Sequence, residues 1–531
     1  MKPVKLISGF MTVGFWTLAS RVLGFARDIM IASFLGTGAV AEAFLVAFSL
    51  PNMFRRFFAE GAFNTAFVPL FSKKLQKGED PLGFARDAFS GLATVLIVFT
   101  LFAQLVMPWL VLAMASGFRG DVRFDLAVDF GRITFAYILF ISLAALLSGV
   151  LNASGRFAAA AAAPVLLNII LVSALLLGEK GAFGSGMEPS NPDLAGLSQG
   201  TILAWGTLLA GVAQMGLVWL AARRAGFTVL PRRPRLTPDL RRLAIIAAPA
   251  MLAGGVVQIN LLVGRQVASF FDGAIAWLSY ADRLYQLPLG VVGIAVGIVL
   301  LPDLSRRLAA ADEAGSQNAL SRAAEISLAL TIPSAVALVV IPLPLVSVLF
   351  ERGAFDFNDS QATAFAVAVY GLGLPAFVMQ KVLQPLYFAR EDTRTPFRFA
   401  LVAMAVNAVA AILCAYLFGF IGAALGTTIA GWAMVLLLAS GCKGMGQSAR
   451  FDSRFHSRIG RIILAALAMG ALLWGLAWLM EPWLFRASVR YPALALLVLA
   501  GIVSYFSIGQ VIGAFRLAEF KTALRRSPKQ K

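Results

Sequence analysis

The stretch AAAAAAPVLLNIILVSALLL, residues 158–177, decides the class of this fold. It contains no charged side chain. As an α-helix it would be about 30 Å long, which matches the hydrocarbon core of a bilayer that about 20 residues can cross. This stretch therefore predicts a transmembrane helix, and the rest of the chain repeats the pattern.

The composition extends this prediction to the whole chain. Of the 531 residues, 59% are hydrophobic and 14% are charged, and the mean hydropathy is +0.82. Soluble domains carry about 25% charged residues, so this chain has too little polar surface to be a set of water-soluble domains. The only histidine, His456, lies in a basic loop, and the two cysteines are not spaced for a metal site, so neither a His-rich zinc site nor a Ser-His-Asp triad is expected. We therefore expect an all-α polytopic membrane protein with no metal and no cofactor, which is not an enzyme.

About fourteen apolar segments are long enough to span the membrane. We expect an N-lobe of six helices (residues 1–222), a basic linker (223–242), a C-lobe of six helices (243–446), and two last helices with a basic tail (447–531). The predicted spans are 4–35, 40–71, 88–115, 126–151, 158–177, 201–222, 243–271, 275–304, 324–350, 364–387, 399–418, 421–440, 462–480 and 493–511.

The basic residues sort by loop. With the N-terminus and every even-numbered loop assigned to the cytosol, that face collects 31 of the 45 Lys and Arg and the opposite face collects 7. An excess of Lys and Arg in cytoplasmic loops is the rule for membrane proteins, so both termini are predicted to be cytosolic. Nucleic-acid binding, the other common meaning of a formal charge of +18, is not expected because no soluble basic domain remains.

The two halves of the chain share an internal repeat. Ala-Ser-Phe, Leu-Pro and a Pro-x-x-Ser-Lys/Arg-Lys/Arg-Leu segment occur in the same order at 32–34, 50–51 and 69–75, and again at 268–270, 287–288 and 302–308. The offsets lie between 233 and 237. Six spans separate the copies, so they have the same orientation, which indicates a parallel repeat of two six-helix lobes.

The remaining 45 − 38 = 7 basic residues lie inside predicted spans. An Arg or Lys facing lipid at mid-bilayer costs about 2.5–3.5 kcal/mol, so these side chains must face protein or a wet cavity. Four acids accompany them, which leaves a balance of about +3 and predicts an anionic ligand. The basic residues are Arg21, Arg27, Arg55, Arg56, Arg265, Arg283 and Lys381, and the acids are Asp28, Glu42, Glu60 and Asp282.

Each of these charges also has a purely structural interpretation. Arg56 and Glu60 are four residues apart on a helix and could form an ion pair, which leaves Arg55 pointing elsewhere. Arg27 with Asp28, and likewise Asp282 with Arg283, are sequence neighbours that point in different directions, so we expect each to find a partner on another helix. Prolines inside the spans predict helix breaks, hinges or passive kinks; they are Pro51, Pro288 and Pro385.

The motifs around these charges resemble the lipid II flippase family, MurJ (MviN), of the MOP exporter superfamily. The segments that carry the resemblance are SRVLGFARD (20–28), LPNMFRR (50–56) with FAEGAF (58–63), YADRL (280–284), Leu151-Asn152 with Arg156-Phe157, and Lys381-Val382-Leu383 with Pro385. The likeness covers nearly the whole chain up to about residue 515.

The resemblance implies a protein of the bacterial inner membrane that flips lipid II, an undecaprenyl-diphosphate-linked disaccharide pentapeptide, to the outer leaflet for peptidoglycan and cell-wall synthesis and cell shape. Two lobes would alternate around a cationic central cavity, and the last two helices would hold the lipid tail. The implied substrate-binding residues are Arg21, Arg27, Asp28, Arg55 and Arg283, with Asn52, Arg56, Glu60, Asp282 and Lys381 in support.

Other functions are compatible with parts of this pattern. The same fold could export another anionic polyprenyl-diphosphate glycan, or could be a MATE-like cation antiporter, although an antiporter would need an acidic cavity. Some members of the family bind sodium through carboxylates in the seventh and eleventh helices. The corresponding spans here carry Gln258, Asn260 and Asn407 instead, so no sodium site is expected.

Overall fold

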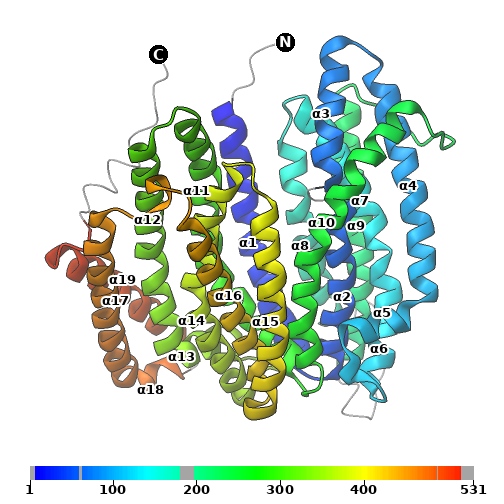
Figure 1. Cartoon of the computed structure of the whole chain (residues 1–531). Helices are drawn as coiled ribbons and strands as arrows, with labels where there is room; N and C mark the ends of the chain where they lie inside the picture. The colour runs from blue at the N-terminus through cyan, green and yellow to red at the C-terminus, as the bar shows by residue number, and fades with distance from the viewer. Residues whose placement is uncertain (1–5, 59–61, 180–195, 487, 516–531) are drawn as a thin grey trace. The chain divides into compact units, whose positions relative to one another are not determined.

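The computed structural model describes residues 6–58, 62–179, 196–486 and 488–515 of the chain (Figure 1). The chain forms two compact units, of which unit 1 comprises Met1–Ala276 with Arg352–Phe355 and unit 2 comprises Trp277–Glu351 with Asp356–Lys531. Within the described ranges every regular element is a helix, apart from one isolated bridge between Arg352 and Phe355. The predicted all-α fold is confirmed.

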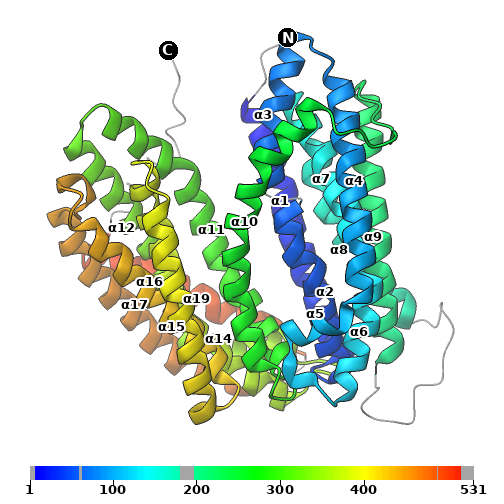
Figure 2. The ribbon, with the colours of Figure 1, turned by 45° about the vertical axis from the view of Figure 1, so that its right-hand side comes forward.

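Unit 1 is built from the first ten α-helices. In it α1 packs on α8, α2 on α6, and α7 and α8 on α9, while α4 runs alongside α7 (Figure 2). The elements are α1 (Leu6–Leu35), α2 (Ala39–Phe58), α3 (Ala62–Lys77), α4 (Pro81–Leu105), α5 (Met107–Met114), η1 (Ser116–Phe118), α6 (Val122–Phe135), α7 (Tyr137–Ala153), α8 (Ala158–Glu179), α9 (Leu197–Arg224) and α10 (Pro238–Ala268).

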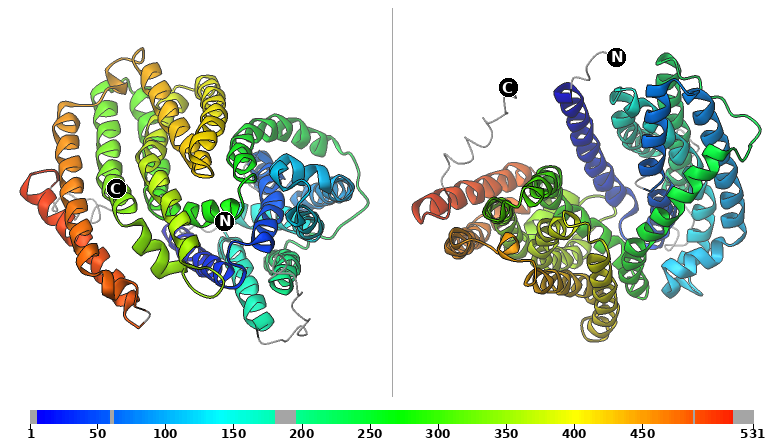
Figure 3. Two further views of the ribbon diagram at one scale, coloured as in Figure 1. Left: turned by 90° about the horizontal axis from the view of Figure 1, so that it is seen from below. Right: turned by 45° about the horizontal axis from the view of Figure 1, so that its top comes forward.

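Unit 2 contains the remaining helices, and it holds almost all of α11. Here α12 packs on α14 and α17, α16 packs on α14 and α15, and α17 and α19 lie side by side (Figure 3). The elements are α11 (Ala274–Ala309), α12 (Glu313–Val340), α13 (Pro342–Phe350), α14 (Phe357–Phe388), α15 (Arg394–Phe418), α16 (Ile421–Cys442), η3 (Gln447–Ala449), α17 (Ser453–Leu479), α18 (Glu481–Leu484) and α19 (Arg490–Val511).

The described part of the chain has ten helical segments that are long and apolar enough to cross a membrane. Helices α1, α2, α3, α10 and α11 are not among them. α3 has only 16 residues, and α2 carries Glu42, Arg55 and Arg56. The predicted polytopic membrane protein is confirmed, whereas the predicted count of fourteen spans is not.

The internal repeat also appears in the positions at which helices are interrupted. α4 ends at Leu105 and α5 starts at Met107, with a proline in its first turn; α12 ends at Val340 and α13 starts at Pro342. The two breaks, at Val106 and Ile341, are 341 − 106 = 235 positions apart, within the range of the sequence offsets. The packing of α7 and α8 on α9 recurs as that of α14 and α15 on α16.

The compact units divide after Ala276, whereas we expected the lobes to divide within residues 223–242. α10, which the repeat assigns to the second lobe, contacts α2, α3, α4 and α5 of unit 1. The repeat boundary itself stays a prediction, because a duplicated segment and a compact unit need not coincide.

The basic segment between α9 and α10 is bound to unit 1. Arg232 donates from Nε to Asp87 Oδ1 of α4 (2.6 Å), and its backbone N–H donates to Ser90 Oγ (2.8 Å). Arg86 donates to the carbonyl of Thr228 (3.0 Å). Asp87 is buried, and its hydrogen bond raises the pKa of Arg232 above its ordinary value. This part of the predicted linker is therefore a strap along α4.

The prolines that we expected to break, hinge or kink helices do not end any helix. Pro51, Pro288 and Pro385 all lie inside helices that continue past them. Pro51 cannot donate to the carbonyl of Ala47, one turn earlier. Thr134 Oγ1 of α6 donates to that carbonyl instead (3.0 Å), so a side chain of a neighbouring helix satisfies the oxygen and α2 is not interrupted.

Candidate functional site

The middle of α1 holds a buried ion pair. Arg27 donates to Asp28 Oδ1 from Nε (3.0 Å) and from Nη2 (2.6 Å), and both side chains are buried. We predicted that each would find its partner on another helix; the two side chains also bind each other, which we did not predict. The Arg side chain is long enough to fold back over its own helix onto the neighbouring carboxylate.

Arg27 is also connected to a second helix, which sequence reasoning missed. Its Nη1 donates to Asn168 Oδ1 of α8 (3.0 Å), and the amide of Asn168 donates to the carbonyls of Ser20 (3.0 Å) and Pro164 (3.3 Å). A Cβ at Gly24 would lie 3.5 Å from the Asn168 amide nitrogen, so the two helices are close there. The sequence does contain a signal for this contact, because Asn168 is a carboxamide within an otherwise apolar stretch of α8.

The C-terminal turn of α2 carries the next group of predicted residues. Phe54 packs against Phe99 of α4 and Phe135 of α6, with ring centroids 5.1 and 5.7 Å away. These rings set the rotation of α2, so Arg55 is half-buried and Arg56 is exposed. Asn52 donates to the Phe48 carbonyl of its own helix (2.8 Å). Glu60, the predicted partner of Arg56, lies outside the described residues.

Unit 2 places Asp282 and Arg283 on α11. Tyr280, in the preceding turn, is buried against Phe350 of α13, with ring centroids 5.6 Å apart. Asp282 accepts a hydrogen bond from Gln286, one turn later. Asp282 and Arg283 are both half-buried.

Lys381 lies on α14 in unit 2. Its side chain is exposed, whereas the next two residues, Val382 and Leu383, are buried in the core of the unit. The lysine is thus on the side of α14 that the core leaves open. Arg21 on α1 is exposed in the same sense within unit 1.

A second charged cluster of unit 1 was not predicted as such. The buried guanidinium of Arg123 contacts Glu42 Oε2 (2.9 Å), Asp121 Oδ2 (2.6 Å) and Asp272 Oδ1 (2.8 Å). Glu42 also accepts the backbone N–H of Ile275 (2.9 Å). The cluster joins α2, α6 and the turn after α10, and its carboxylates already surround the cation. We therefore interpret this ion-pair cluster as structural: it stabilises the packing of these elements.

The predicted residues thus fall into two kinds. Arg27 and Asp28 are buried and neutralise each other, whereas Arg21, Arg55 and Arg56 of unit 1 and Lys381 of unit 2 reach the surface of their units. Guanidinium groups present paired N–H donors that match phosphate oxygens. Each unit by itself therefore offers cationic donors suited to a phosphate-bearing ligand.

Comparison with known proteins gives consistent matches. The model of the family "Lipid II flippase MurJ" matches residues 31–493. A "Probable lipid II flippase MurJ" of Rhizobium meliloti is 43% identical over 98% of this chain and 97% of its own length. A "Lipid II flippase MurJ" of Burkholderia cenocepacia is 35% identical over 83% of this chain and 85% of its own length.

Solved structures agree with these matches. A structure described as "Lipid II flippase MurJ, inward closed conformation" has a TM-score of 0.77 and 26% identity, and covers 94% of this chain and 98% of its own. An inward-facing MATE family transporter of the MOP superfamily has a TM-score of 0.65 at 15% identity, covering 81% of this chain and 95% of its own, which shows the shared fold alone. The chain is a multi-pass membrane protein that belongs to the lipid II flippase MurJ family.

Proposed function

We propose that this protein flips lipid II, the lipid-linked precursor of peptidoglycan, from the cytosolic to the outer leaflet of the bacterial inner membrane. Family membership supports the reaction, and the observation that carries the proposal is the set of arginines inside helices. Arg27 is buried on α1, and Arg55 is half-buried at the end of α2. Asp28 balances the charge of Arg27, and the paired N–H donors of these guanidiniums match the oxygens of a diphosphate ligand.

Arg21, Arg27, Asp28, Arg55 and Arg283 are the proposed substrate-binding residues. Arg21 and Asp28 are seven residues apart on α1 and so share one face of the helix. A diphosphate arriving on this face competes with Asp28 for the guanidinium of Arg27, while Asn168 holds the guanidinium in place through Nη1. Asn52, Arg56, Glu60, Asp282 and Lys381 are proposed to support binding.

The transport step follows from the same charges. In the proposed cycle the two lobes alternate around the cationic cavity, and the arginines hold the diphosphate while access changes from one leaflet to the other. α17 and α19 carry exposed apolar side chains, among them Leu464, Leu467, Leu499 and Val503. We propose that these two helices accommodate the polyprenyl tail.

The orientation of the chain is also a proposal. Loop charge assigns both termini to the cytosol.

A MATE-like exchange of cations is the second candidate function, because solved MATE transporters share the fold. Exchange of cations needs acidic ligands, whereas the buried acid of α1, Asp28, is bonded to Arg27. The proposed cargo is therefore an anion.

The proposal is tested with Arg55→Ala and Arg283→Ala in cells depleted of the wild-type protein. We expect both variants to insert normally and to abolish the appearance of lipid II in the outer leaflet, measured by its accessibility to an external probe. Arg306→Ala is the matched control, since that arginine has a 79% exposed side chain and lies outside the proposed site.

A binding experiment tests the cargo directly. Purified full-length protein should bind lipid II more tightly than an uncharged polyprenyl lipid, and Arg55→Ala should remove most of the difference. Equal binding of the two lipids by the wild-type protein would contradict the proposed cargo. Normal export by both cavity variants would contradict the proposed site.

A further inference from the structure

Three aromatic rings of unit 2 form a cluster beside the charged residues of α11. Tyr285 of α11 packs against Tyr370 and Phe377 of α14, with ring centroids 5.0 and 5.6 Å away. Tyr370 is buried, whereas Tyr285 and Phe377 are half-buried, so part of each of these two rings reaches the surface of unit 2. We call these three rings the aromatic platform.

Polar side chains lie along the edge of the aromatic platform. On α11, Gln286 donates a hydrogen bond to Asp282, and both residues share a helix face with Tyr285, because residues three and four apart are neighbours on a helix. On α14, Lys381 follows Phe377 by one turn, and its side chain is exposed. The platform is thus bordered by a carboxylate, a carboxamide and an ammonium group.

The face of α14 that carries Phe377 and Lys381 belongs neither to the core of unit 2 nor to a lipid-facing surface. The core takes the other side of the helix, where Val378, Val382 and Leu383 are buried. Charged side chains that face lipid are costly, so an exposed lysine on this face indicates a wet surface. Aromatic rings on a wet surface are available to a ligand.

Helix α16 holds the aromatic platform in a fixed position. Phe377 lies over Gly431 of α16, where an added Cβ would come within 2.7 Å of the phenylalanine ring. Gln380 donates to the carbonyl of the same glycine (2.9 Å), and Thr428 of α16 donates to the carbonyl of Val369 on α14 (3.0 Å). The rings are therefore preorganised, which lowers the conformational entropy that a bound ligand would cost.

A pyranose ring matches this combination of groups. A sugar has an apolar face of C–H groups and a rim of hydroxyl groups, and the face of an aromatic ring carries negative charge that attracts the C–H groups. The carboxylate, the carboxamide and the ammonium group can exchange hydrogen bonds with the hydroxyl rim. A diphosphate needs cations and a polyprenyl chain needs apolar surface, so neither accounts for rings bordered by polar groups of mixed kind.

We propose that the aromatic platform stacks against a sugar ring of the lipid II headgroup and makes the protein select a glycosylated cargo. This inference rests on the proposed function, because it assigns to unit 2 the sugar that adjoins the diphosphate of the same cargo. Tyr285 and Phe377 supply the rings that contact the sugar, and the polar side chains at the edge of the platform bind its hydroxyl groups.

The test measures binding of two probes to purified full-length protein in detergent by native mass spectrometry. One probe is undecaprenyl diphosphate, and the other is undecaprenyl diphosphate that carries the disaccharide without the pentapeptide. We expect the wild-type protein to bind the glycosylated probe about tenfold more tightly, the effect expected of one or two aromatic contacts. Tyr285→Leu and Phe377→Leu should each reduce this ratio toward one and leave the affinity for undecaprenyl diphosphate unchanged.

The matched control and the conservative variants isolate the role of the rings. Phe365 lies on the same helix as Phe377 but is 61% exposed, so Phe365→Leu should keep the wild-type ratio. Tyr285→Phe and Phe377→Tyr retain an aromatic ring and should keep most of the preference for the glycosylated probe. If the leucine variants instead lose both probes equally, the rings serve only the fold and the proposal is overturned.

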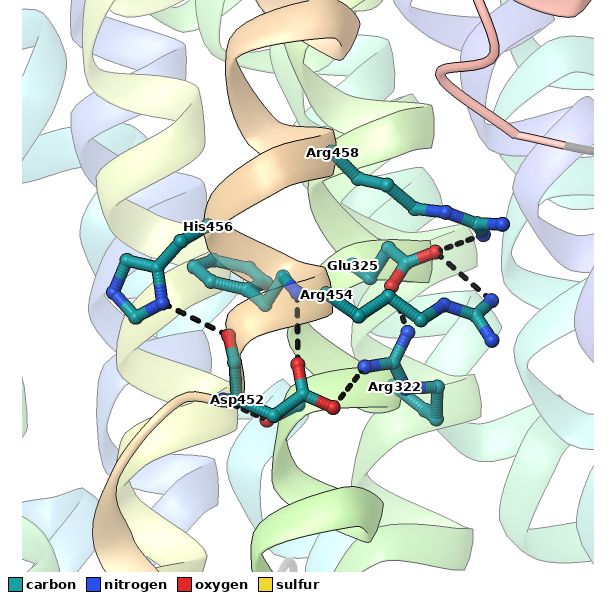
Figure 4. A network of polar contacts seen from close by, with 8 residues as sticks. Arg322, Glu325, Asp452, Arg454, His456 and Arg458 are labelled. Atoms are coloured by element: carbon teal, nitrogen blue, oxygen red, sulfur yellow. Dashed lines mark hydrogen bonds and ion pairs between the residues drawn. The ribbon is translucent and has the colours of Figure 1, made fainter.

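The leucine variants should fold, because unit 2 is held together by contacts outside the platform. Glu325 of α12 is buried and accepts hydrogen bonds from Arg458 (2.6 Å), Arg454 (3.4 Å) and Arg322, which joins α12 to α17 (Figure 4). Helix α12 in turn packs on α14. The affinity of each variant for undecaprenyl diphosphate reports whether its fold is intact.

The outcomes separate this inference from the proposed function. Equal binding of the two probes by the wild-type protein, or an unchanged ratio in both leucine variants, would overturn the platform and leave the diphosphate site in place. If the wild-type protein prefers neither probe over an uncharged polyprenyl lipid, the proposed function fails and the platform with it. Arg55→Ala should weaken both probes and keep their ratio; a ratio that falls to one in this variant would place the sugar at that arginine and overturn the assignment.

Discussion

At the residue scale, Arg27 has two partners that differ in character. Asp28 balances its charge, and Asn168 fixes its direction from another helix. A buried pair of charges is stable mainly because each member compensates the other, so removing one member leaves an expensive charge behind. Arg27 therefore contributes both to the stability of α1 and to the proposed binding of a phosphate.

Arg27→Ala should destabilise the protein, because Asp28 would keep a buried charge without its guanidinium. We expect a loss of about 3–5 kcal/mol, the usual result of breaking a buried ion pair from one side. Thermal melting of the detergent-purified protein measures it. Arg27→Ala with Asp28→Asn removes both charges and should recover part of the loss; a single variant as stable as the wild type would contradict the pairing.

Asn168→Ala should have a smaller effect on stability and should impair export. Loss of a hydrogen bond to a charged group costs about 1.5–3 kcal/mol, and the guanidinium of Arg27 would also lose its anchor on α8. Melting temperature and lipid II accessibility are measured on the same variant. Wild-type values for both would show that Asn168 does not hold Arg27 in the working protein.

At the element scale, the strap on α4 and the loop at 352–355 are held in place by specific hydrogen bonds. The strap is bound through Arg232 and Arg86, and the loop at 352–355 is bound to the end of α1 through a hydrogen bond from Ala354 to the carbonyl of Ser33 (2.7 Å). Backbone groups in such segments need partners, and specific side chains or close approaches supply them.

Asp87→Asn should release the strap. The buried Asp87 would lose its charge and with it the strong hydrogen bond to Arg232. We expect trypsin to cleave after the arginines of residues 223–235 about tenfold faster, because local opening should become easier by about 1.5 kcal/mol or more. Asp129→Asn, at a 72% exposed carboxylate, is the control. Equal cleavage rates for the two variants would exclude Asp87 as the anchor.

Gly353→Ala should disrupt the loop at 352–355. Gly353 has φ +59°, and a Cβ there would lie 2.2 Å from the Ser33 carbonyl oxygen. The left-handed backbone alone costs about 1–2 kcal/mol for a non-glycine residue, and the overlap adds to it. Gly216→Ala, inside α9 with nothing within 4 Å, should be neutral or stabilising by about 0.5–1 kcal/mol. The melting temperatures of the two variants measure these effects. An unchanged melting temperature for Gly353→Ala would contradict the close contact between Gly353 and Ser33.

At the scale of the whole molecule, the sorting of basic residues predicts the orientation in the membrane. With the native Cys414 and Cys442 replaced by alanine, Arg119→Cys, at an exposed position in the loop after α5, should react with a membrane-impermeant maleimide added outside intact spheroplasts. Arg235→Cys should react only after the membrane is permeabilised, because its loop is assigned to the cytosol. Labelling of the two positions in the opposite order would reverse the proposed topology.

Much of the fold could be predicted because the signals are local. The apolar stretch at residues 158–177 became α8 (Ala158–Glu179), and the offsets of the repeat recur in the breaks at Val106 and Ile341. The division after Ala276 could not be predicted, since it depends on which helix faces α10 covers. The candidate site was predicted as a set of residue types, whereas the partner of Arg27 on α8 was missed.

The sequence by itself determined that the chain is helical, that it lies in a membrane, and that its helices carry arginines, from which an anionic ligand is predicted. These properties follow from hydropathy and charge, which act residue by residue. Only the tertiary structure decided that Arg27 binds Asp28 and Asn168, that Thr134 satisfies the carbonyl below Pro51, and that three arginines converge around Glu325. The physical reason is that hydrogen bonds and ion pairs are directional and short-ranged, so they depend on which helix faces meet.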